Sequence, residues 1–99
     1  MEKDHFKDRH VDCTFFNKVK VGMNVYICTK EKQRTATSIK DLNVGVVQRV
    51  LTKRNHPRGI KVEILQTDGK LAIGRCTYIV EKEGYIFTRN GIRYPDEIA

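Results

Sequence analysis

The sequence is poor in the residues that mark several classes of protein, with three cysteines and one serine among 99 residues. Cys13, Cys28 and Cys76 are odd in number and widely spaced, which argues against a disulfide framework and favours a reducing, cytoplasmic compartment. No apolar run approaches the roughly 18 residues that span a bilayer. The charged start, MEKDHFKDRHVD, also lacks the apolar stretch of a signal peptide. We therefore expect no membrane partner.

Acidic side chains are scarce in the middle of the chain. The net charge is +7. Residues 1–18 are neutral overall, residues 63–99 carry one net negative charge, and residues 19–62 hold ten basic side chains against Glu31 and Asp41. Like charges crowded on a small surface repel each other, so this concentration predicts an anionic partner.

Alternating apolar residues predict several short strands. In VGMNVYICT (residues 21–29), Val25 and Ile27 share one face while Tyr26 and Cys28 share the other, which is typical of a half-buried strand. Strands are also predicted over 44–51, where Gly45 indicates a bend or a close backbone approach, and over 59–65 and 70–80.

Two dipeptides predict the hairpin turns. Asp68-Gly69 and Asn90-Gly91 are typical of primed turns, the second closing a hairpin within residues 84–94. The long polar stretch 30–43 predicts a functional loop, with a short helix near Ser38 to Leu42. Together these elements predict an all-β protein: a small SH3-like barrel over 19–80, a short N-terminal extension over 1–18, and an additional C-terminal β-hairpin and tail over 81–99.

The middle of the chain resembles the YwbE-like family of small bacterial proteins. Five elements carry the resemblance: QRT at 33–35, GVVQRVLT at 45–52, HPRGIKV at 56–62, Asp68-Gly69 and Gly74-Arg75. The resemblance covers roughly residues 19–80 and implies a fold rather than an activity, because that family is itself little characterised. A looser similarity to the KOW pattern of SH3-like barrels implies contact with RNA or ribosomal components.

Basic residues gather on the two central loops and predict nucleic-acid binding. If the loops meet at one end of the barrel, they form a cationic rim that docks phosphates without reading sequence. The candidate contacts are Lys30, Lys32, Arg34, Lys40, Arg49, Lys53, Arg54, His56, Arg58 and Lys61. Tyr26, on the face predicted to point outward, is a candidate for stacking on a base. The partner we expect is RNA or a ribonucleoprotein.

Other readings of these residues remain open. Polar turns are commonly cationic, Tyr26 could belong to the packing, and His56 before Pro57 could hydrogen-bond its own turn. His5, His10, Cys13 and Cys28 match no standard zinc spacing, so we expect neither a metal nor a cofactor. Cys28 and Cys76 lie within predicted strands, where a small buried side chain is the usual role.

Catalytic signatures are missing from the sequence. Ser38 lies in no nucleophile-elbow context, and neither a P-loop nor an H-E-x-x-H motif occurs. We therefore expect no enzyme. The alternative function is a protein-interaction module, which would bind a partner through the barrel loops or through the hairpin with Tyr85, Phe87, Ile92 and Tyr94.

Overall fold

The computed structural model of the protein describes residues 5–98. Within that part of the chain the secondary structure consists of strands and single-turn 3-10 helices. The strands are β1 (Asn24–Thr29), β2 (Asn43–Val50), β3 (Lys61–Gln66), β4 (Leu71–Val80), β5 (Ile86–Thr88) and β6 (Gly91–Arg93). The helical turns are η1 (Val11–Thr14), η2 (Lys30–Lys32), η3 (Ile39–Asp41) and η4 (Pro95–Glu97). Nothing helical in residues 5–98 combines the length and apolar character that a membrane crossing requires.

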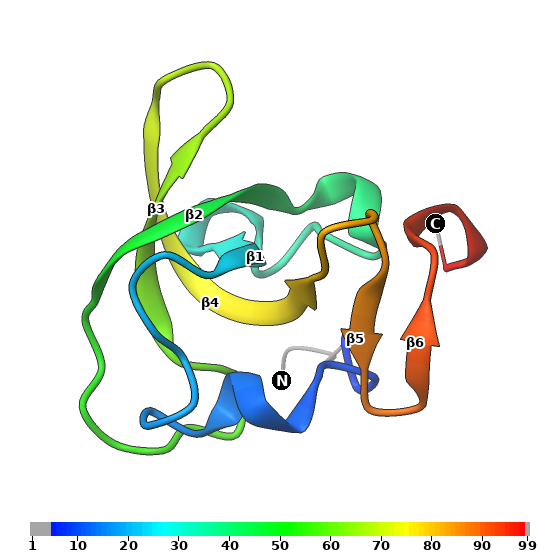
Figure 1. Cartoon of the computed structure of the whole chain (residues 1–99), viewed down its shortest axis with the longest axis horizontal. Coiled ribbons are helices and arrows are strands. Elements are labelled where there is room, and N and C mark those ends of the chain that lie inside the picture. The colour runs from blue at the N-terminus through cyan, green and yellow to red at the C-terminus, as the bar shows by residue number, and fades with distance from the viewer. Residues whose placement is uncertain (1–4, 99) are drawn as a thin grey trace.

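The strands form one antiparallel sheet that closes on itself. Their order is β1-β2-β3-β4-β5-β6, and β1 also pairs with β4. This second pairing closes the first four strands into a barrel, and the β5–β6 hairpin extends the sheet from the end of β4 (Figure 1). The predicted all-β class is confirmed, and so is the small SH3-like barrel with an added C-terminal hairpin. Closure leaves the four barrel strands without the exposed edges of an open sheet, and the short strand β6 forms the remaining edge.

The barrel interior is filled by β-branched side chains from alternate strand positions. Val25 and Ile27 of β1 are fully buried there, as are Ile60, Val62 and Ile64 in and before β3. These three residues lie on one face of the strand predicted over 59–65, because residues two apart on a strand share a face.

A second apolar cluster covers the opposite face of β1. Cys28 and the half-buried Tyr26 pack there against Tyr78 of β4. The other members of the cluster are Phe6, Ala36, Ile39, Leu42 and Ile86. The prediction that Tyr26 points outward is thus wrong, because the N-terminal segment, the β1–β2 loop and the hairpin cover that face. The burial expected for Cys28 is confirmed.

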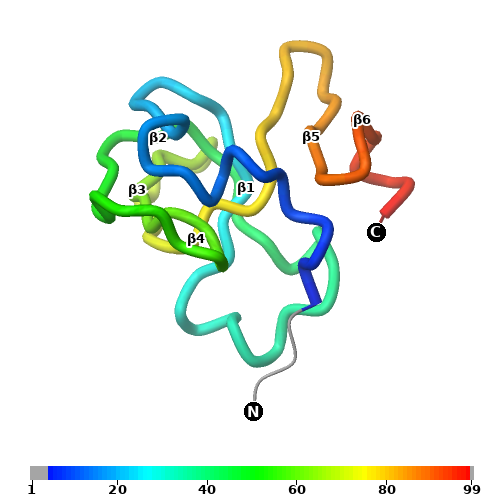
Figure 2. The backbone as a smooth tube through the Cα atoms, turned by 90° about the horizontal axis from the view of Figure 1, so that it is seen from below, coloured from blue at the N-terminus to red at the C-terminus, as the bar shows by residue number. Residues whose placement is uncertain are grey.

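The N-terminal segment, residues 5–19, begins between the barrel and the β5–β6 hairpin and then crosses the end of the barrel, away from the hairpin (Figure 2). Arg9 forms an isolated antiparallel bridge with Thr88 of β5. Further along, the backbone N–H of His56 donates to the carbonyl of Thr14 at 2.9 Å, which ties the β2–β3 loop to the same segment. The described part of the N-terminal extension is therefore packed into the fold on both sides.

Glycine permits a close backbone approach and shapes the two hairpin turns. A Cβ at Gly45 would lie 2.3 Å from the carbonyl oxygen of Leu65, which confirms the predicted close approach. Gly69 and Gly91 have positive φ, and every described residue with positive φ is a glycine. Both hairpins are confirmed, yet their turns are not primed, since a type I′ turn needs positive φ at both central residues. Glycine instead follows the turn, as in a G1 bulge.

Candidate functional site

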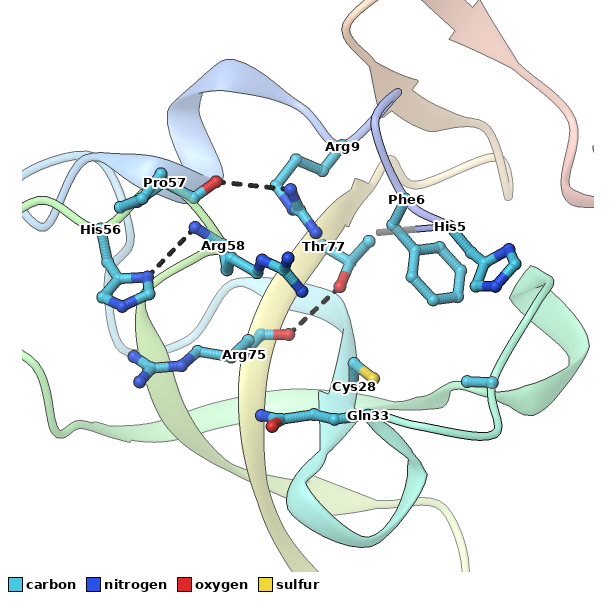
Figure 3. A pocket seen from close by; sticks show the side chains of 11 residues that line it. His5, Phe6, Arg9, Cys28, Gln33, His56, Pro57, Arg58, Arg75 and Thr77 are labelled. Atoms are coloured by element: carbon cyan, nitrogen blue, oxygen red, sulfur yellow. Dashed lines mark hydrogen bonds between the residues drawn. The ribbon is translucent and has the colours of Figure 1, made fainter. Parts of the chain in front are cut away.

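Three segments far apart in the sequence meet at one pocket on the side of the barrel. They are the N-terminal segment, the β1–β2 loop and the β2–β3 loop, and β4 forms the floor between them (Figure 3). The pocket has a volume of about 410 Å³. Its basic lining residues are His5, Arg9, His56, Arg58 and Arg75, and no acidic side chain among the described residues lines it. We call it the cationic pocket.

The other side chains that line the cationic pocket are either polar and uncharged or apolar. Gln33 and Thr77 contribute polar groups. The apolar wall consists of Phe6, Cys28, Ala36 and Pro57. Because Phe6, Cys28 and Ala36 also belong to the second apolar cluster, this wall is continuous with the packed interior.

Two of the arginines are held by the backbone of the β2–β3 loop. Arg9 is only 7% exposed, and its Nη1 donates to the carbonyl of Pro57 at 3.3 Å. Arg75 is half-buried on β4, and its Nη1 donates to the carbonyl of Gly59 at 3.4 Å. Arg58 is exposed, and Figure 3 shows its side chain extending across the pocket while that of Arg75 runs toward the His56 side. The three guanidinium groups thus approach the cavity from different elements.

His56 holds the turn on which Arg58 stands. Its Nδ1 accepts from the backbone N–H of Arg58 at 3.1 Å, and its carbonyl accepts from the N–H of Gly59 at 3.0 Å. Partial burial lowers the pKa of His56, and the positive charges of Arg75, Arg58 and Arg9 lower it further. Burial and the nearby positive charges therefore both favour the neutral imidazole, whose Nδ1 serves as an acceptor.

The β1–β2 loop is ordered by its own short helices. A capping box joins Ser38 and Asp41 around η3, which confirms the predicted short helix. The Asp41 carboxylate accepts the backbone N–H groups of Thr37 and Ser38, and these bonds lower the pKa of Asp41. These bonds hold the conformation of the β1–β2 loop, which supplies Gln33 and Ala36 to the lining of the cationic pocket.

The structure brings only some of the predicted site residues together. His56 and Arg58 line the cationic pocket, whereas Lys30 and Lys32 line a separate depression that also contains Glu63. The other predicted cations are exposed and line neither of these depressions: Arg34, Lys40, Arg49, Lys53, Arg54 and Lys61.

Arg49 has an acidic partner on the neighbouring strand. Its Nε and Nη2 donate to the two carboxylate oxygens of Glu63 at 3.0 and 3.1 Å. The two residues are opposite each other in the β2–β3 register, and the pairing lowers the pKa of Glu63. The charge of Arg49 is therefore offset within the fold.

Tyr26 is part of the packing around β1. Its ring meets that of Tyr78 edge to face, with centroids 6.4 Å apart, and burial raises its pKa. The Tyr78 hydroxyl in turn donates to the Asp8 carboxylate at 2.6 Å. A base that stacks on Tyr26 would have to share its ring with the Tyr78 side chain.

Sequence reasoning missed four residues that line the cationic pocket: His5, Arg9, Gln33 and Arg75. Gln33 and Arg75 stand within the QRT and Gly-Arg elements of the family resemblance, which was a signal for them. Arg9 had none, because it lies in a segment whose charges cancel. Only the folding of that segment onto the barrel reveals its place.

Residues 5–98 contain no group of three or more His, Cys, Asp or Glu side chains arranged to hold a metal ion. None of the three cysteines forms a disulfide, and all three are buried, which confirms the predicted thiols.

Comparison with known proteins gives a family and nothing more specific. Residues 13–79 match the model of a family described as uncharacterized conserved protein (DUF2196). No curated protein and no solved structure matches the chain significantly. The matched range includes the two central loops and Arg75, while His5, Phe6 and Arg9 precede it.

Proposed function

We propose that this chain, which belongs to the family of uncharacterized conserved proteins DUF2196, is a non-catalytic binding protein for RNA that docks phosphates on its basic loops. The observation that carries the proposal is the cationic pocket, which is lined by Arg9, Arg58 and Arg75 and by no acidic side chain of residues 5–98. Guanidinium groups bind phosphate oxygens through two parallel hydrogen bonds. A phosphate-bearing ligand is therefore the partner that this arrangement fits best.

The basic surface continues beyond the pocket along the β2–β3 loop. Lys61 of β3 stands opposite Arg75 of β4, so two like charges share one face of the barrel. Lys53 and Arg54 are exposed earlier in the same loop. Successive phosphates of one strand would neutralise these charges and release their counterions.

The β1–β2 loop extends the same surface on the other side. Its Gln33 and Ala36 line the cationic pocket, and its cations are Lys30, Lys32, Arg34 and Lys40. Side chains on flexible lysine stems position a backbone rather than read bases. Binding should therefore tolerate many sequences.

The proposal also draws on the two resemblances of the sequence that are more specific than the family match. The resemblance to YwbE-like proteins concerns the fold, while the looser similarity to the KOW pattern favours RNA over DNA and a ribonucleoprotein setting. A cytoplasmic location agrees with three buried cysteines outside any disulfide. A non-catalytic role agrees with a pocket to whose lining the described part of the chain contributes no carboxylate, and whose His56 uses Nδ1 to hold the turn.

A protein-interaction module is the second candidate function. The β5–β6 hairpin leaves Ile92 and Tyr94 about half exposed, at 54% and 45%. The ring centroids of Tyr85 and Tyr94 lie 4.5 Å apart, so the two rings form one aromatic surface on this hairpin. Such a surface would bind a protein with little dependence on salt.

The test is fluorescence anisotropy with single-stranded RNA, duplex RNA and duplex DNA at several salt concentrations. The natural chain is compared with a Lys53→Ala, Arg54→Ala, Arg58→Ala triple variant. We expect single-stranded RNA to bind with a log-linear salt dependence, and the variant to lower the magnitude of the slope by about 2.

A charge-matched control removes three exposed cations outside the two loops, through Lys20→Ala, Lys82→Ala and Arg89→Ala. This control should keep the salt slope if the phosphates dock on the loops. Equal losses in both variants would mean that only net charge matters. Absence of binding to all probes at low salt would contradict the proposal and favour a protein partner at the hairpin.

A further inference from the structure

The cationic pocket has two chemically different halves. Arg58, Arg75 and His56 lie on one side of the cavity in Figure 3, and Phe6 and Cys28 lie on the other. At about 410 Å³ the pocket falls in the roughly 300–1,000 Å³ range of small-ligand sites. A ligand that fits must therefore carry an anionic end and a compact, less polar body.

The number of fixed positive charges points to a doubly charged anion. Three arginines line the pocket, and guanidinium groups remain protonated at all physiological pH values. An internal phosphodiester of a nucleic acid carries one negative charge, whereas a phosphomonoester carries about 1.5 to 2 near neutral pH. The monoester therefore offsets more of the charge that these arginines concentrate.

Two of the arginines are also held in place before any ligand arrives. The guanidinium groups of Arg9 and Arg75 each donate to a carbonyl of the β2–β3 turn, while His56 fixes the backbone N–H of Arg58 and leaves its exposed side chain to adapt to the ligand. The guanidinium of Arg75 has five N–H donors, so its bond to the carbonyl of Gly59 leaves others for an anion. A site held in this way loses less conformational freedom on binding than a cluster of surface lysines does.

From these observations we infer that the cationic pocket holds the terminal phosphomonoester of a nucleic-acid strand together with its adjoining nucleoside. The phosphate lies among Arg9, Arg58 and Arg75, and the nucleoside lies against the wall of Phe6, Cys28 and Ala36. This inference rests on the proposed RNA binding and adds to it the recognition of a strand end.

The deciding experiment measures the affinity of one short oligouridylate in three forms: with a 5′-phosphate, with a 3′-phosphate, and with hydroxyls at both ends. We expect one phosphorylated form to bind about tenfold or more tightly than the hydroxyl form, as charge-assisted hydrogen bonds would give. The form that binds more tightly identifies the end. Equal affinity of all three forms would overturn the inference while leaving RNA binding intact, and no binding of any form would overturn both.

Variants locate the effect in the pocket. Arg58→Ala removes the exposed guanidinium, and it should reduce the preference for the phosphorylated end to nearly one. Arg58→Lys keeps the charge but loses the two-pronged contact, so it should keep part of the preference. Lys82→Ala, an exposed cation that does not line the pocket, should leave the preference unchanged. A preference that survives Arg58→Ala would place the end elsewhere.

Competition tests the apolar half of the pocket. Uridine monophosphate and inorganic phosphate are compared as competitors of the phosphorylated oligomer at equal ionic strength. The nucleotide should compete about tenfold more effectively, because the wall of Phe6, Cys28 and Ala36 adds contact area. Equal competition would show that the pocket recognises phosphate alone and would overturn the nucleoside part of the inference.

Discussion

The Sγ atoms of Cys13 and Cys76 lie 3.1 Å apart in the barrel core, joining the N-terminal segment to β4. Both thiols are fully buried. The hydrogen bond to Cys76 and the burial of the thiol raise the pKa of Cys13 well above its usual value. Since the thiolate is the reactive form, the pair should be inert while the protein is folded.

We expect iodoacetamide at pH 8 to leave Cys13 and Cys76 unmodified in the native protein and to alkylate both in urea, as read by mass spectrometry. Cys13→Ala should lower the free energy of unfolding by about 1–2 kcal/mol, because it leaves a gap in a packed core. Val11→Ala, an exposed position on the same helical turn, is the matched control and should change little. Rapid alkylation of the native protein would contradict a stable contact between this segment and β4.

Arg75 and Lys61 oppose each other on β4 and β3, a pairing that costs stability because like charges directly opposite repel. Lys61→Glu should therefore raise the free energy of unfolding by about 0.2–1 kcal/mol. The same change should weaken RNA binding and flatten its salt dependence. Lys61→Gln should give a stability and an RNA affinity between those of the natural chain and of Lys61→Glu. A variant that loses both stability and affinity would show that Lys61 has a structural role instead.

Much of the barrel could be predicted because its signals are local. Alternation from Ile60 to Ile64 and glycine-containing turns depend on residues close together in sequence. The two faces of β1 could not be told apart, since the segments that bury Tyr26 and Cys28 arrive from distant parts of the chain. The same limit applied to the cationic pocket: Arg58 stood in an evident basic cluster, but Arg9 joined it only through long-range folding.

Gly59 is the residue of the β2–β3 turn that tolerates substitution least. Its φ is +104°, and a Cβ there would lie 2.1 Å from the carbonyl oxygen of Cys76. Gly59→Ala should therefore cost about 2–4 kcal/mol of stability in urea denaturation. Gly69→Ala is the matched control, since Gly69 also has positive φ but a Cβ there would meet nothing within 4 Å. Gly69→Ala should cost about 1–2 kcal/mol of stability, because only the left-handed backbone conformation is unfavourable for alanine there. Equal costs would show that the turn can move away from β4.

The pKa of His56 reports directly on the charge of the cationic pocket. Partial burial and the charges of Arg75, Arg58 and Arg9 lower this pKa, so protonation is disfavoured in the folded state. The unfolded chain, with a histidine pKa of about 6.5, binds the proton more readily. Stability from this group is therefore present above about pH 6.5 and is lost as the pH falls toward the lower folded pKa.

We expect NMR titration of the His56 imidazole to give a pKa below about 6.5 in the free protein. Arg58→Ala should raise that value, because it removes one of the positive charges that face the ring. Uridine monophosphate should also raise it, since a bound dianion favours the imidazolium. Sodium chloride at the same ionic strength is the control, because it screens charge without occupying the pocket. An identical rise with both salts would show that screening alone acts on His56, and that no anion sits among the three arginines.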